Sequence, residues 1–141
     1  MDSFAVGSQA ALLQSASKGA PPRRIADSAE AIWIRIDSAL TPIIGARGVN
    51  ALFKRSVSVV GEHHPWMQTA YAVARNPSVF TVLGATLAQQ SASSAAAVNG
   101  ELLEAFFELL ANLIGRPLTE RLLQPALEKF SNGDDVQDVA R

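Results

Sequence analysis

The chain contains no cysteine and few aromatic residues. Without cysteine it can form no disulfide bond, no thiolate metal site and no cysteine nucleophile. Aromatic residues make up 6% of the sequence, against 48% for hydrophobic residues of all kinds, many of them alanine. That composition favours close helix packing over a β-sandwich, which needs aromatic and β-branched residues. We therefore expect an all-α protein, a compact bundle of five or six helices.

The sequence also lacks an apolar run of the ~18 residues that a membrane span requires. The longest candidates are interrupted by Thr81, Gly84, Glu104 and Glu108. The N-terminal segment has no basic region followed by a sustained apolar core, so it does not resemble a secretory signal. These absences predict a soluble, cytoplasmic chain that makes no membrane contact.

Charge is nearly balanced over the whole chain, at a net −1, but it is uneven along it. Residues 1–75 hold eight basic and five acidic residues, whereas residues 76–141 hold four basic and eight acidic ones. Such asymmetry supports self-association or an anionic partner in some proteins and is an ordinary solvated surface in most. We favour the solvated surface.

Residues 25–130 are predicted to form a single helical domain. Residues 1–24 are rich in Ser, Gly, Gln and Ala and are expected to be a flexible arm, and residues 131–141 to be a disordered acidic tail. Thr41 and Pro42 fit an N-cap and a first-turn proline, so the first helix should stop there and the chain should restart, with a second apolar stripe after Gly48. The predicted helices cover residues 25–40, 49–60, 66–75, 78–90, about 93–114 and 116–130, the last as one helix or two around Pro125.

The predicted helix over 93–114 has the clearest pattern, with Ser91 as candidate N-cap and Gly115 at its end. Two neighbouring apolar rows oppose a polar stripe, so a wide face should be buried. Helices of this kind lie in the middle of a bundle or at a dimer interface. The first row is Leu102, Phe106, Leu109 and Leu113. The second row, our candidate interaction face, is Leu103, Phe107, Leu110 and Ile114.

The stretch TPIIGARGVN, residues 41–50, is the one glycine-rich loop with a basic residue. It suits a tight corner between two helices, where glycine supplies backbone angles that other residues avoid. It also suits an anion site, because free amides at the start of the helix near Val49 would lie beside Arg47. We favour the corner.

The longer stretch IWIRIDSALTPIIGARGVNALFKRS resembles the KH nucleic-acid-binding module in its alternating isoleucines and its GxxG loop. The resemblance implies a loop that grips the nucleotide backbone beside an apolar groove for the bases. The loop would be Gly45, Ala46, Arg47 and Gly48, and the groove would include Ile43 and Ile44. The module also needs three strands, yet no alternating apolar strand follows Gly61, and residues 32–40 fit helical spacing as well. Nucleic-acid binding through Gly45, Arg47 and Gly48 is therefore kept as an alternative.

His63 and His64 are the only histidines, and they precede Pro65. Adjacent side chains seldom converge on one metal ion, and no third ligand is suggested. Phosphotransfer would need a histidine exposed in mid-helix, which the following proline disfavours. We expect a polar loop in which Pro65 and Trp66 fold back as a lid on the core, and the sequence assigns the histidine pair no role.

Glu101, Glu104 and Glu108 share one helix face, a spacing that could mimic paired carboxylates or a di-metal site. The di-iron bundle pattern pairs Glu with His at i, i+3, and no such His is present. A solvated acidic face is the better interpretation.

No serine nucleophile elbow, P-loop or dinucleotide-binding glycine motif is present. We therefore expect no catalytic residue, no cofactor and no metal. The leading hypothesis is a small non-enzymatic interaction or regulatory module, with signalling as one such role. It would work through protein–protein contacts as a homodimer. A second alternative, beside nucleic-acid binding, is an apolar small ligand in the bundle core among Phe80, Phe106 and Phe107.

Overall fold

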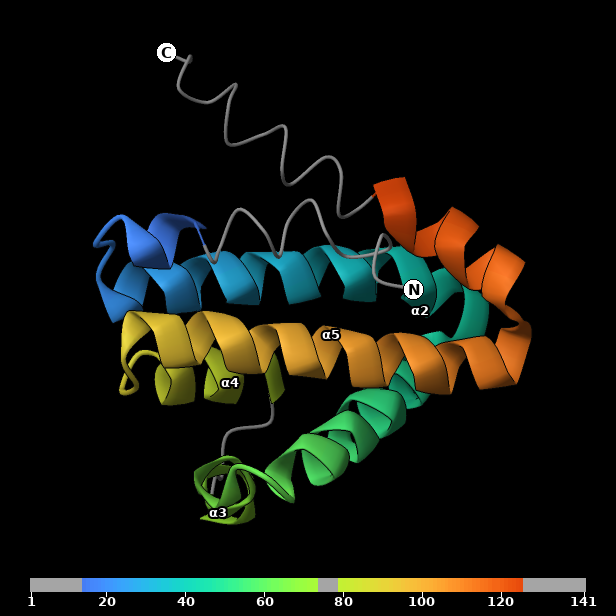
Figure 1. Ribbon diagram of the computed structural model, residues 1–141. Helices are drawn as coiled ribbons and strands as arrows, with labels where there is room; N and C mark the ends of the chain where they lie inside the picture. The colour runs from blue at the N-terminus through green and yellow to red at the C-terminus, as the bar shows by residue number, and fades with distance from the viewer. Residues whose placement is uncertain (1–13, 74–78, 126–141) are drawn as a thin grey trace.

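The structure, a computed structural model, describes residues 14–73 and 79–125. For residues 71–73 it describes the backbone only. Every regular element in these ranges is a helix, which confirms the predicted all-α fold (Figure 1). No helix of the described part has the length and apolar character to cross a membrane. The elements are α2 (Pro22–Gly61), α3 (Pro65–Val73), α4 (Val79–Leu87) and α5 (Ala92–Ile114), with short helical segments over residues 14–17 and 116–125.

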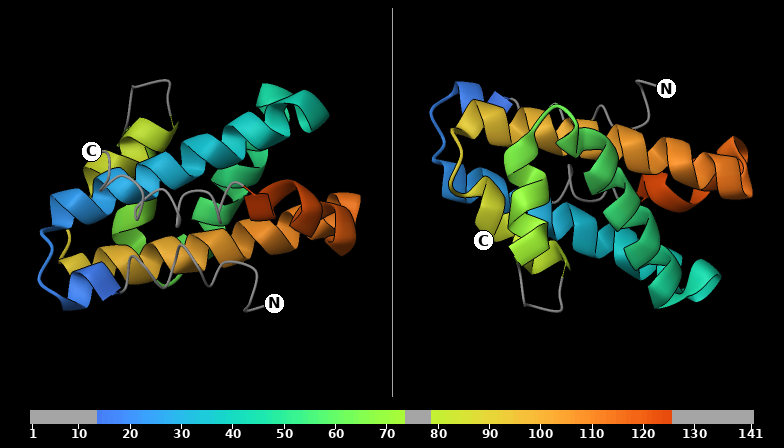
Figure 2. Two further views of the ribbon diagram at one scale, coloured as in Figure 1. Left: turned by 90° about the horizontal axis from the view of Figure 1, so that it is seen from above. Right: turned by 90° about the horizontal axis from the view of Figure 1, so that it is seen from below.

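The long helix α2 organises the bundle because it contacts α3, α4 and α5. Its first part, residues 22–44, is called here the proximal arm and lies alongside α5 (Figures 1 and 2). Its second part, residues 46–61, is called the distal arm and turns away toward α3. The segment 116–125 folds back from the end of α5.

The break in α2 is at Gly45, which has φ 82° and ψ 158° inside an otherwise helical segment. That conformation is almost restricted to glycine, so the predicted corner is confirmed. The predicted stop at Thr41 and Pro42 is wrong, because the helix continues through Pro42. The hydroxyl of Thr41 bonds to Asp37 Oδ1 at 3.1 Å rather than capping a new helix. Ser38, whose carbonyl loses its partner at the proline, is exposed to solvent.

Both predicted ends of α5 are confirmed. The Ser91 hydroxyl accepts a hydrogen bond from the Ser94 amide at 3.1 Å, and so caps one of the free amides of the first turn. Gly115 ends the helix with φ 93°.

Helical spacing over residues 25–40 and 49–60 predicts one apolar face on each arm of α2, and the structure buries both faces. The buried residues are Ile25, Ala29, Ile32, Trp33, Ile36, Leu40, Val49, Phe53, Val57 and Val60. Leu113, which belongs to the first predicted row, and Leu118 of the segment 116–125 are instead exposed. Leu113 is 63% exposed and Leu118 is 40% exposed. Helical spacing identified the face of α5 that packs in the core, but it did not show how far along the helix the core extends.

The predicted flexible arm ends at residue 24, but residues before that point already pack against the core. Residues 14–17 are helical, α2 begins at Pro22, and Ala16 and Ala20 pack against the core. Trp66 also packs against the core, as the predicted lid requires, while Pro65 is exposed. The predicted tail over 131–141 lies outside the described residues, as does the end of the predicted helix over 116–130.

Candidate functional site

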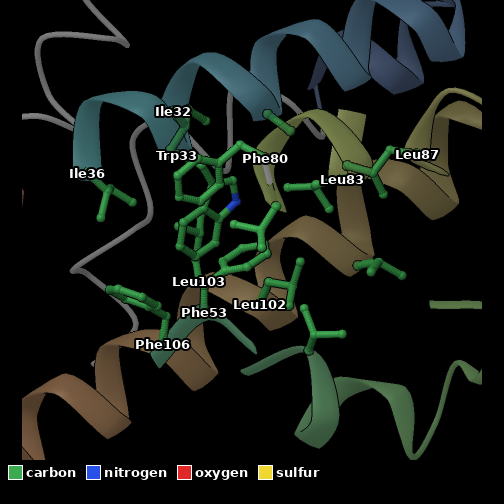
Figure 3. Close-up of a cluster of buried hydrophobic side chains, with 14 of the residues drawn as sticks. Ile32, Trp33, Ile36, Phe53, Phe80, Leu83, Leu87, Leu102, Leu103 and Phe106 are labelled. Atoms are coloured by element: carbon green, nitrogen blue, oxygen red, sulfur yellow. The ribbon is translucent and has the colours of Figure 1, made fainter. Parts of the chain in front are cut away.

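Trp33 lies at the centre of the core, with a phenyl ring from each of three helical segments around it (Figure 3). The rings of Phe53 and Phe106 meet the indole edge to face, at centroid distances of 4.9 Å and 5.2 Å. Phe80 of α4 stacks on it at 6.3 Å. Because aromatic pairs of these geometries are attractive beyond the area they bury, this cluster fixes the proximal arm against α4, α5 and the distal arm.

One polar group is buried with these rings. Asn99 of α5 is fully buried, and its Oδ1 accepts a hydrogen bond from Trp33 Nε1 at 2.8 Å. Its Nδ2 has no hydrogen-bond partner among the described residues. Because a buried acceptor matches the indole N–H at one place only, the bond fixes the register of α5 along the proximal arm. Asn99 continues the row of Leu103 and Phe107 one turn toward the start of α5, and the sequence analysis did not select it because it considered only the apolar members of that row.

The core residues proposed for an apolar ligand are separated in the structure. Phe80 and Phe106 both contact Trp33, so an indole already fills the space that a ligand between them would need. Phe107 projects elsewhere, with the Arg116 guanidinium 5.0 Å above its ring. The three phenyl rings therefore do not line one common site.

The predicted interaction face on α5 needs a correction. Leu103, Phe107 and Leu110 are buried within the single chain, at 2% exposure or less, and Ile114 is partly buried. Intrachain packing already covers this row, so it is not a free surface. The wide apolar face therefore packs within the bundle, which is the first of the two positions that its pattern predicts.

The glycine-rich loop is a solvent-exposed corner. Gly45 and Arg47 are exposed and Gly48 is partly buried against Ile44. The fold that the KH resemblance implied is not formed, because Ile32 and Ile36 lie in the proximal arm of α2 and the described residues contain no strand. Binding of an anion or a nucleic acid at this corner stays a prediction.

The acidic stripe of α5 faces solvent, as predicted. Glu101 lies 3.2 Å from His64 Nε2, and Glu108 lies 3.7 Å from Arg116. Glu104 has no ion pair among the described residues. His64 thus joins the turn after α2 to α5, while its neighbour His63 is exposed. In the described part of the chain no three acidic or histidine side chains group closely enough to hold a metal ion.

Large aliphatic side chains are exposed near the two glycine turns. The corner at Gly45 and the turn at Gly115 lie at the same end in Figures 1 and 2. Ile43 is 52% exposed beside the first turn, and Leu113 and Leu118 are exposed on either side of the second. We call these three residues the apolar end. Their spacing in the sequence fits a buried face. They differ from core residues only because no other segment covers them in the folded chain.

Comparisons of the chain with protein-family models, with curated proteins and with solved structures find no match.

Proposed function

We propose that the chain is a non-enzymatic protein-interaction module that self-associates as a homodimer through its apolar end. The observation that carries the proposal is the exposure of Ile43, Leu113 and Leu118 around the two glycine turns. Grouped aliphatic side chains on a surface mark interaction sites more often than scattered ones do. The sequence adds support, because it contains none of the catalytic motifs considered and no cofactor motif.

A second copy of the chain is a suitable occupant for this surface. Exposed aliphatic side chains of one chain can pack against the same side chains of a second copy across a two-fold axis, which is the commonest symmetry of soluble oligomers. Three side chains cover less than the ~800 Å² per partner of a standard stable interface. We therefore expect a weak dimer, with a dissociation constant in the micromolar range or above. Such an equilibrium suits a regulatory role in the cytoplasm, where concentration would set the dimeric fraction.

Sedimentation equilibrium over a wide concentration range tests the proposal. The unchanged chain should show a reversible monomer–dimer equilibrium. The double variant Leu113→Ser/Leu118→Ser should remain monomeric at concentrations where the unchanged chain is dimeric. A chain that stays monomeric throughout the range, or a double variant that dimerises as before, would refute the assignment of this surface.

A matched control is available elsewhere on α2. Ile34 and Val59 are also large, aliphatic and exposed, and they lie in the middle of the proximal arm and near the end of the distal arm. The variant Ile34→Ser/Val59→Ser removes a comparable apolar surface and should leave the dimer intact. Equal loss in both variants would show that general hydrophobicity, and not the apolar end, drives association.

A further inference from the structure

The distal arm of α2 carries positive charge that no described residue neutralises. Residues 38–61 contain no acidic residue, whereas Arg47, Lys54 and Arg55 are all exposed. None of the three forms an ion pair with another described residue. We call Arg47, Lys54 and Arg55 the basic face.

Helical geometry places the basic face on the outer side of the distal arm. At about 100° per residue, its three members fall within an arc of about 100°. The buried residues Val49 and Phe53 lie on the other side of the same helix. Arg47 and Lys54 are separated by about 10 Å along the helix axis. A partner with acidic groups at a similar spacing would therefore match this face.

The chain itself contains an acidic segment of that spacing. Residues 131–140, called here the acidic segment, include Asp134, Asp135 and Asp138 and no basic residue. In an extended conformation Asp135 and Asp138 are about 10 Å apart. The acidic segment is thus complementary to the basic face in charge and in spacing.

The acidic segment follows a part of the chain that lies near the start of the distal arm. The segment 116–125 folds back from Gly115, at the same end of the molecule as the Gly45 corner (Figures 1 and 2). Residue 125 and Lys54 each lie within about 15 Å of their glycine turn, as measured along a helix. The thirteen residues from there to Asp138 span up to about 45 Å when extended. This length is sufficient to bring the aspartates to the basic face.

Other cations of the described chain are less suitable partners. Arg23 lies 3.8 Å from the Asp27 carboxylate, and Arg116 lies within 4 Å of two glutamates. Lys18 and Arg24 are exposed, but they flank the start of α2 at the opposite end of the molecule (Figure 1). The basic face therefore combines free charge with a short path for the chain.

We propose that the acidic segment binds the basic face of the same chain through its three aspartates. Exposed ion pairs are individually weak and are screened by salt. A tether of this length, however, supplies an effective concentration of about a millimolar, so the contact forms within one chain in low salt. The bound segment covers the cations of the distal arm and competes with any polyanion for them. This inference does not depend on the proposed self-association.

Paramagnetic relaxation enhancement tests the inference. Because the chain has no cysteine, Gln137→Cys provides a single site for a nitroxide label within the acidic segment. In a dilute sample at low salt, the amides of residues 47–55 should lose signal intensity relative to the same sample with the label reduced. Added salt should restore the intensity. Replacing the three aspartates by asparagine in the labelled chain should abolish the loss.

A matched pair of variants separates the basic face from net charge. In the labelled chain, Arg47→Glu/Lys54→Glu should abolish the loss of intensity over the distal arm, because attraction becomes repulsion. Lys18→Glu/Arg24→Glu makes the same change in net charge at the opposite end of the molecule and should leave the loss unchanged. An equal effect of the two variants would overturn the assignment of the basic face.

The remaining outcomes are equally decisive. The inference is wrong if the label broadens no amide of the distal arm, or only the neighbours of Arg121, the exposed cation in the segment 116–125. It is also wrong if broadening appears only between a labelled chain and a second, unlabelled copy, since the segment would then bind a partner. Single-stranded RNA that binds the basic face equally with and without the aspartates would show that the segment does not cover it. Failure of self-association would leave this test unaffected, because the sample is dilute.

Discussion

The buried centre around Trp33 and the exposed apolar end both include hydrophobic residues of α2 and α5. Phe106 and Leu113 belong to one predicted row on α5, yet Phe106 is fully packed and Leu113 is open to solvent. At Phe106 the proximal arm lies alongside α5, so the indole of Trp33 covers the phenyl ring of Phe106. Beyond the Gly45 corner the distal arm turns away. The position along a helix, and not only the face, determines whether an apolar residue stabilises the fold or remains available to a partner.

The sharpest test of this comparison pairs two substitutions in that one row. Phe106→Ala should lower the free energy of unfolding by about 3–5 kcal/mol, because it leaves a cavity against Trp33. Leu113→Ala, on the same helix, should lower it by about 0.5 kcal/mol or less. Chemical denaturation in urea measures both values. Similar losses at the two positions would mean that Leu113 is covered in the folded chain and that the comparison fails.

The buried hydrogen bond provides the second test. Asn99→Leu should destabilise the chain by about 2 kcal/mol, because the Trp33 N–H stays buried without an acceptor. Trp33→Phe combined with Asn99→Leu should cost less than the sum of the two single changes, by about 1 kcal/mol. A double-mutant cycle in urea measures this coupling. Strict additivity would contradict the bond as the link between the proximal arm and α5.

The corner itself can be altered. Gly45→Ala should cost about 1–2 kcal/mol, because φ 82° is unfavourable for a residue with a side chain, although a Cβ there meets no atom within 4 Å. The same change at Gly48 should cost less, since its backbone is helical and the atoms nearest to an added Cβ, at 3.2 Å, belong to the Ile44 side chain. Thermal unfolding of the two variants compares them. Equal stability would show that the positive φ at Gly45 stores no strain in the alanine variant.

The smallest effect on stability is expected at the apolar end. Leu118→Ser should change the free energy of unfolding by about 0.5 kcal/mol or less, because the side chain is already exposed. It should still weaken self-association, whereas Ile34→Ser should not. Urea denaturation of dilute samples and sedimentation of concentrated ones measure the two effects separately. A large loss of stability in this variant would mean that Leu118 is packed in the core, and it would contradict the assignment of Leu118 to the apolar end.

Periodicity predicted the helical class, the inner face of α2 and the wide face of α5, because each of these depends on spacing along one element. Gly45 and Gly115 were identified as a corner and an end from their freedom at positive φ, and Ser91 from its capping hydroxyl. The continuation of α2 through Pro42 was missed, since an exposed carbonyl at Ser38 tolerates the lost hydrogen bond.

The features of the site depend on distant segments and left little signal in the sequence. The Trp33–Asn99 bond joins residues 66 positions apart. The exposure of Leu113 and Leu118 depends on where the distal arm goes after the corner. Neither follows from the spacing of neighbouring residues.

A dilution series of two-dimensional amide NMR spectra tests the central claim, self-association through the apolar end, most directly. We predict that amides flanking Gly45 and Gly115 shift progressively with protein concentration, while those of α4 (Val79–Leu87) stay fixed. Spectra that do not change with concentration, or shifts confined to other surfaces, would contradict the account.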